Sequence, residues 1–63
     1  METQTRRIRR RLVREGWYLE RHGRGHDIYR HPDIPHTIIL PRHRTVSSGV
    51  ARRIAKDAGW EES

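Results

Sequence analysis

The sequence predicts an α+β fold in which a helix, three antiparallel strands and a second helix follow one another, with both helices on one face of the sheet. Apolar residues recur at helical spacing near both ends of the 63-residue chain. Short β-prone segments lie between these two regions. The turns that separate them are short, which favours antiparallel pairing. Residues 1–63 are expected to form a single domain, with residues 61–63 as a frayed tail.

The first helix is predicted over residues 3–15. Ile8, Leu12 and Val13 recur at helical spacing, and Gly16 follows where a terminating glycine is expected. Arginines fill most of the remaining positions, and Arg9 falls near the middle of the narrow apolar stripe. Its charged head must therefore reach solvent or a partner. A charge run of this kind is usually a solvated helix face.

Three β-prone segments bounded by glycine or proline turns are predicted to be strands: residues 17–21, 26–31 and 37–40. The two-residue period of a strand places Trp17 and Leu19 on one face. In the last strand the same period turns Ile38 and Leu40 inward.

The second helix is expected to begin after Ser47 or Ser48, either of which can serve as its N-cap. One apolar stripe runs along it, formed by Val50, Ala51, Ile54, Ala55 and Ala58. Gly59 is expected to end the helix, and Trp60 to fold back on the core.

Charge is the strongest compositional signal. The chain has 14 Lys and Arg against 8 Asp and Glu, a formal net charge of +6, and Lys56 is its only lysine. GC-rich coding also favours arginine over lysine, but it does not explain the net charge. A basic domain of this size most often binds nucleic acid, less often an acidic protein or a membrane surface. No cysteine is present, and no apolar run follows Met1, so we expect a cytoplasmic protein without a membrane partner.

The chain contains five histidines: His22, His26, His31, His36 and His43. His22 and His26 have a spacing that suits zinc on a helix, but Gly23 and Gly25 make a helix here improbable. We therefore expect no metal and no cofactor. Most single histidines in proteins are surface or hydrogen-bonded residues, and His31 is expected to be structural or to face a partner protein.

His26 differs from the others because it stands between a glycine turn and a strand. Gly25 lets a bulky substrate approach closely, and Arg21, Arg24 and Arg30 supply positive charge. Imidazole exchanges protons near neutral pH, at about pH 6.5 when unperturbed. RNA carries its own nucleophile, the 2′-hydroxyl, so a base, an acid and cations suffice to cleave it without metal.

Several segments together resemble the HicA family of toxin–antitoxin systems: Gly16-Trp17, Arg24 to Pro32, Pro41-Arg42-His43, Gly49 and Ala58-Gly59. The resemblance implies a small, metal-independent ribonuclease with a fold similar to a double-stranded-RNA-binding domain. It also implies cleavage of single-stranded mRNA and inhibition by a HicB-like antitoxin, which is expected to cover the active histidine. The family's catalytic histidine corresponds to His26.

The sequence departs from the family pattern around this histidine. Gly25 replaces a serine, Arg24 replaces a glycine, and Asp27 stands where a second histidine is common. A charge interaction with Asp27 is expected to raise the pKa of His26, although neighbours on a strand point to opposite faces. His43 is either an acid partner, a substrate-orienting residue or merely a cap at the strand end.

The expected RNA-binding residues are Arg21, Arg24, Gly25, Arg30, Arg42 and His43. Three functions remain open from the sequence. The first is a toxin that cleaves mRNA as an endoribonuclease through His26. The second is a non-catalytic basic RNA- or DNA-binding module of the same fold. The third is an interaction protein whose arginine-rich face serves only an acidic partner.

Overall fold

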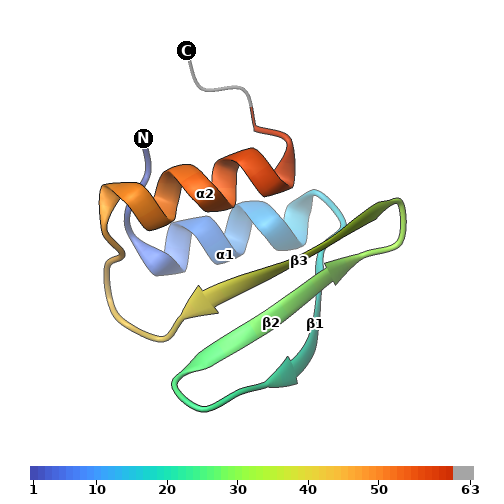
Figure 1. Cartoon of the computed structure of the whole chain (residues 1–63), viewed down its shortest axis with the longest axis horizontal. Helices are drawn as coiled ribbons and strands as arrows, with labels where there is room; N and C mark the ends of the chain where they lie inside the picture. Colours follow the sequence, from blue (N-terminus) through green and yellow to red (C-terminus); the bar gives the residue numbers. More distant parts are fainter. Residues whose placement is uncertain (61–63) are drawn as a thin grey trace.

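Two helices cover one face of a three-stranded antiparallel sheet in the computed structural model, which describes residues 1–60 (Figure 1). The elements in chain order are α1 (Thr5–Arg14), β1 (Tyr18–His22), β2 (His26–His31), β3 (Ile34–Pro41) and α2 (Ser48–Ala58). This order confirms the predicted fold class. The expectation of a frayed tail at residues 61–63 lies outside the described residues.

Helix α1 has a narrower apolar stripe than the sequence suggested. Ile8 and Leu12 are fully buried, whereas Val13 is 57% exposed. Val13 lies about 100° around the helix from Leu12, and the sheet does not extend that far. The helix ends at Arg14 with Glu15 as its C-cap, and Gly16 follows with a φ of 99°, a conformation that favours glycine.

The sheet has the order β1-β2-β3, so β1 and β3 are its edges. Strand β3 begins at Ile34, three residues before the predicted start, and it includes Pro35. A proline cannot donate to a neighbouring strand, but an edge strand tolerates it. Ile38 lies opposite Tyr29 in the register, and both are buried beneath the helices.

Strand β1 lies at the edge of the sheet away from the helices (Figure 1). All of its residues are exposed, including Leu19, although Trp17 just before the strand is buried. Trp17 and Leu19, predicted to share one face of the strand, therefore differ in burial. The helices pack on β3, and they do not reach far enough to cover β1.

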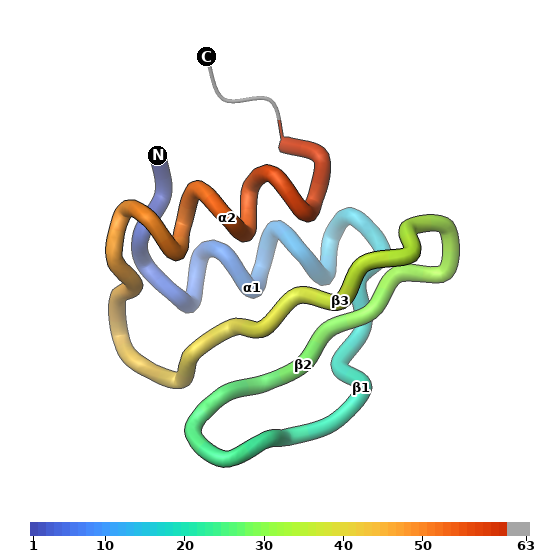
Figure 2. The backbone as a smooth tube through the Cα atoms, viewed as in Figure 1, coloured from blue at the N-terminus to red at the C-terminus, as the bar shows by residue number. Residues whose placement is uncertain are grey.

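The core lies between the helices and the sheet. Its buried members are Ile8, Leu12, Trp17, Tyr29, Ile38, Leu40, Val46, Ala51, Ile54 and Ala58. Trp60 packs against this cluster, and its indole Nε1 donates to Glu15 Oε1 at 2.7 Å. This contact confirms that Trp60 folds back. The β1–β2 hairpin, by contrast, projects away from the helices (Figure 2).

Helix α2 has a defined cap at each end. Of the two candidate serines, Ser47 is the N-cap, and its hydroxyl accepts from the Val50 backbone N–H at 3.2 Å. Gly59 closes the other end in the left-handed conformation, with a φ of 78°. The predicted apolar stripe is buried except at Val50, which is exposed.

The Ser47 cap provides a test of the fold. We expect Ser47→Ala to lower the free energy of unfolding by about 0.5–2 kcal/mol, because one backbone donor of the helix loses its partner. Urea unfolding followed by circular dichroism measures this change. Ser48→Ala is the matched control and should have a smaller effect, so equal losses for the two variants would contradict the assignment.

Candidate functional site

The tip of the β1–β2 hairpin holds His26 in a defined position. His26 is partly exposed, and its imidazole lies against Gly23, where an added Cβ would come within 2.7 Å of Nε2. Position 23 must therefore be glycine for the ring to rest there. Gly25 has a φ of 79° and open space beside it. Within residues 1–60 the imidazole of His26 makes no hydrogen bond.

Asp27 links the hairpin to the end of β3. Its carboxylate is largely buried, with 9% of the residue exposed. Asp27 Oδ1 accepts from His22 Nδ1 at 2.7 Å and from Arg42 Nε at 2.9 Å. Arg42 also donates from Nη2 to the Gly23 carbonyl at 3.1 Å and from its backbone N–H to the Gly25 carbonyl at 3.1 Å. These bonds fix the turn that carries His26.

The hydrogen bonds from His22 and then Arg42 lower the pKa of Asp27 below its ordinary value, and they outweigh the opposing effect of burial. The carboxylate is thus ionised at neutral pH. Because an ionised carboxylate only accepts, His22 must carry a proton on Nδ1. Asp27 makes no direct contact with His26, although a charge interaction between them was expected. Neighbouring residues of β2 point to opposite faces of the sheet, and the Asp27 carboxylate bonds to His22 and Arg42 instead.

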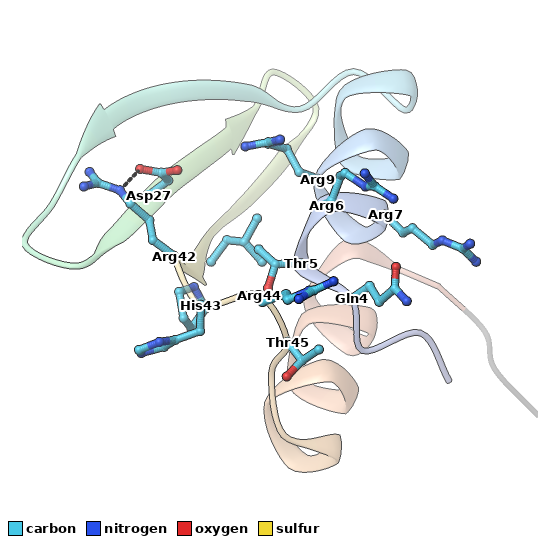
Figure 3. Close-up of a pocket in the computed structure, with 12 residues that line it drawn as sticks. Gln4, Thr5, Arg6, Arg7, Arg9, Asp27, Arg42, His43, Arg44 and Thr45 are labelled. Carbon is cyan, nitrogen blue, oxygen red and sulfur yellow. Dashed lines mark hydrogen bonds and ion pairs between the residues drawn. The ribbon is translucent and has the colours of Figure 1, made fainter.

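An open cavity of about 620 Å³ lies beside this cluster, between α1 and the ends of β2 and β3 (Figure 3). Five arginines line it: Arg6, Arg7, Arg9, Arg42 and Arg44. Arg9 extends from α1 towards the sheet, on the side where Asp27 and Arg42 meet (Figure 3). Asp27 is the carboxylate among the lining residues, and its charge is already shared between Arg42 and His22. The cavity is therefore strongly positive and suited to an anion.

The structure brings only part of the predicted RNA-binding set together. Arg24 and Gly25 form the turn beside His26, while Arg42 and His43 line the cavity. Arg30 lies further along β2 and donates to Glu20 Oε2 at 3.1 Å, so much of its charge is neutralised. Arg21 is exposed on β1, with its Nε 4.0 Å from Glu20 Oε1.

His31 has the structural role that was one of its two expected roles. Its Nε2 donates to the Glu15 carbonyl at 2.9 Å, and its Nδ1 accepts from the Asp33 backbone N–H at 3.0 Å. Its ring also meets Trp17 edge to face, with centroids 5.3 Å apart. This histidine therefore joins the end of β2 to the end of α1.

Two features of the site were not found from the sequence. His22 was considered only as a zinc ligand, although the hairpin register places it opposite Asp27. The arginines of α1 were interpreted as a solvated face, yet Arg6 and Arg9 line the cavity. The position of Arg9 within the apolar stripe was the one available signal, because such a residue must direct its charge along the edge of the core.

Residues 5–60 of the chain match the sequence model of a family described as the HicA toxin of bacterial toxin–antitoxin systems. The chain belongs to the HicA toxin family. A search of curated proteins finds no match for this HicA protein. In the described part of the HicA chain, histidine, aspartate and glutamate side chains form no cluster of three or more suited to a metal ion. No helix among residues 1–60 is long and apolar enough to cross a membrane.

The lowered pKa of Asp27 predicts how the stability of the HicA protein depends on pH. A carboxylate whose pKa falls on folding stabilises the native state above its unfolded pKa, and that contribution is lost as the pH falls through the folded pKa. We therefore expect the stability difference between wild type and Asp27→Asn to be constant at neutral pH and to shrink below the ordinary value of 3.8.

Urea unfolding at a series of pH values between 7 and 2 measures this difference. Asp33→Asn is the matched control, because the Asp33 carboxylate contacts no cation among the described residues. A difference for Asp27→Asn that stays the same across the whole range would show that its ionisation is not coupled to folding.

Proposed function

We propose that this HicA-family toxin is a metal-independent endoribonuclease that cleaves mRNA, with His26 as a general acid or base. The observation that carries the proposal is the imidazole of His26, partly exposed and without a hydrogen bond, at a hairpin tip tied to an arginine-lined cavity. The match to the HicA family adds independent support.

The chemistry requires little from the protein because RNA supplies the nucleophile. His26 removes the proton from the 2′-hydroxyl as the 2′-oxygen attacks phosphorus. The bond from phosphorus to the 5′-oxygen then breaks and leaves a 2′,3′-cyclic phosphate and a 5′-hydroxyl. Arg24 beside His26, together with Arg42, whose Nη2 reaches the Gly23 carbonyl, would stabilise the negative charge that builds on the phosphorane. General acid–base catalysis of this kind contributes typically about 10²–10⁴-fold.

The proposed substrate is single-stranded mRNA, and the proposed setting is the cytoplasm. The proposed inhibitor is a HicB-like antitoxin that covers His26, because occlusion silences a site that depends on one exposed ring. Residues 1–63 would act as a single domain and would need no cofactor. Arg21, Arg24, Gly25, Arg30, Arg42 and His43 remain the proposed RNA-binding set, to which the cavity adds Arg6, Arg9 and Arg44.

The decisive variant is His26→Ala. We expect the purified variant to remain folded and to lose at least about 10²-fold in the rate of RNA cleavage measured in EDTA, because its proton acceptor is gone. His36→Ala is the matched control, since His36 is an exposed residue of β3 and lies outside the cavity and the turn. A His26→Ala protein that cleaves RNA as fast as wild type would end the assignment.

The arginine-lined cavity also supports the alternative of a binding module without turnover. In either case we expect Arg9→Ala to weaken binding to a single-stranded RNA and to reduce the slope of log affinity against log salt by about 0.7, the value for one phosphate contact. Fluorescence anisotropy at several salt concentrations measures the slope.

Arg52→Ala is the control for charge alone, because Arg52 is exposed on α2 outside the cavity. An equal change for both arginines would show that the cavity contributes nothing beyond net charge. RNA that binds to wild type with a steep slope but stays intact for hours would favour the module without turnover.

A further inference from the structure

Cleavage of RNA needs a proton for the leaving 5′-oxygen as well as a base for the 2′-hydroxyl. Resting on the function proposed above, we propose that His22, oriented by Asp27, is the general acid that protonates the leaving 5′-oxygen. The sequence offered only His43 for this role.

The first support is the orientation of the His22 ring. Its Nδ1 donates to the buried carboxylate of Asp27 at 2.7 Å, while 64% of the side chain is exposed. In the form that acts as an acid, the ring therefore has one N–H directed at Asp27 and a second, on Nε2, that is free to reach a substrate. A ring held in this way is preorganised for proton transfer, whereas a freely rotating surface histidine is not.

The second support is the position of His22 relative to His26. His22 ends β1, and the ring of His26 lies against Gly23, the next residue in the chain. His22 is on the same face as Asp27, whereas His26 points to the opposite face because it neighbours Asp27 in β2. The two imidazoles therefore lie on opposite faces of the chain at Gly23, a residue without a side chain directly after β1.

This arrangement fits an in-line displacement at phosphorus. The attacking 2′-oxygen and the leaving 5′-oxygen lie on opposite sides of the phosphorus atom, so the base and the acid must also stand on opposite sides. A phosphodiester that crosses the chain at Gly23, directly after β1, would meet His26 on one side and His22 on the other. His26 takes the 2′-hydroxyl proton as the O2′–P bond forms, and His22 gives its Nε2 proton to O5′ as the P–O5′ bond breaks.

His43 is less suited to this role. It lies in the loop after β3, it is exposed, and its ring makes no hydrogen bond within the described residues. Nothing therefore fixes its tautomer or its direction. Because His43 lines the cavity, it suits a contact with the RNA backbone better than proton transfer.

The experiment compares two substrates that differ only in the leaving atom. Wild-type protein first cleaves a mixed-sequence single-stranded RNA, which identifies a susceptible linkage. A short oligonucleotide is then made with that linkage as its only ribonucleotide, and a second one carries sulfur in place of the bridging 5′-oxygen. A thiolate leaves without protonation far more readily than an alkoxide, because a thiol has a pKa of only about 8.5.

Four variants are compared with wild type on both substrates: His22→Ala, His26→Ala, His43→Ala and His36→Ala. We expect His22→Ala to lose about 10²–10⁴-fold on the oxygen substrate and to come within about tenfold of wild type on the sulfur substrate. His26→Ala should be slow on both substrates, because a base is still required. His36→Ala should resemble wild type on both substrates. His43→Ala removes a residue of the proposed RNA-binding set and should lose activity by a similar factor on both substrates, without rescue by sulfur. Circular dichroism checks that each variant is folded.

The outcomes separate this inference from the proposed function. Wild-type protein that cleaves neither substrate overturns both. Cleavage that depends on His26 but is unchanged in His22→Ala overturns only the role of His22. Slow cleavage of both substrates by His22→Ala also overturns that role, because sulfur would have removed the need for an acid. Rescue by sulfur of His43→Ala or His26→Ala, in place of His22→Ala, assigns the acid to that other histidine.

Discussion

The carboxylate of Asp27 is the contact on which the candidate site depends. It joins His22 at the end of β1 and Arg42 just after β3 to the second residue of β2, so one side chain connects all three strands. Burying a charge is unfavourable unless it is paired and hydrogen-bonded, and here two donors satisfy the same oxygen. Removal of either donor would leave a buried charge with fewer partners, which costs more than the net value of the bond itself. The loss of His22 or Arg42 is therefore expected to destabilise the whole cluster of Asp27, His22 and Arg42.

The shape of the core explains why such a polar connection is needed. The helices pack on β3, and Trp17, Tyr29 and Ile38 carry the core only part of the way across the sheet. Strand β1 is exposed along its whole length, so apolar burial contributes little to holding the hairpin tip. A 63-residue domain also has little surplus stability to spare. Arg42 compensates locally, since it bonds to Asp27 and to the carbonyls of Gly23 and Gly25 on the two sides of the turn.

Much of the fold follows from local sequence patterns. The element order, the inward positions of Ile38 and Leu40, the glycine after each helix and the return of Trp60 were all predicted, because each depends on spacing or on a single residue type. The start of β3 was not predicted, because Pro35 in the sequence indicates a turn. Only the strand order shows that β3 is an edge strand, where a proline is tolerated. The exposure of Leu19 was not predicted either. Strand periodicity gives the face of a residue, whereas its burial depends on where the helices end.

The candidate site was harder to predict because its parts meet only in three dimensions. His26 could be chosen from its turn and from the family resemblance. The bond between Asp27 and Arg42 joins residues 15 positions apart, and no local pattern indicates it. His22 illustrates the intermediate case, because its partner lies five residues away across a tight hairpin. A register drawn from the turn would have placed these two residues opposite each other, but the i, i+4 spacing with His26 directed attention to zinc instead.

The excess of positive charge has a consequence for the free protein. Arg6, Arg9 and Arg44 line one cavity without a carboxylate of their own among the described residues, so the folded chain brings like charges together. Such a surface destabilises the isolated protein through self-repulsion, and any anion that fills it relieves that repulsion. RNA and an acidic antitoxin segment would both do so, and each would stabilise the fold in proportion to its occupancy. On the proposed function, substrate and inhibitor would therefore compete for the same charges.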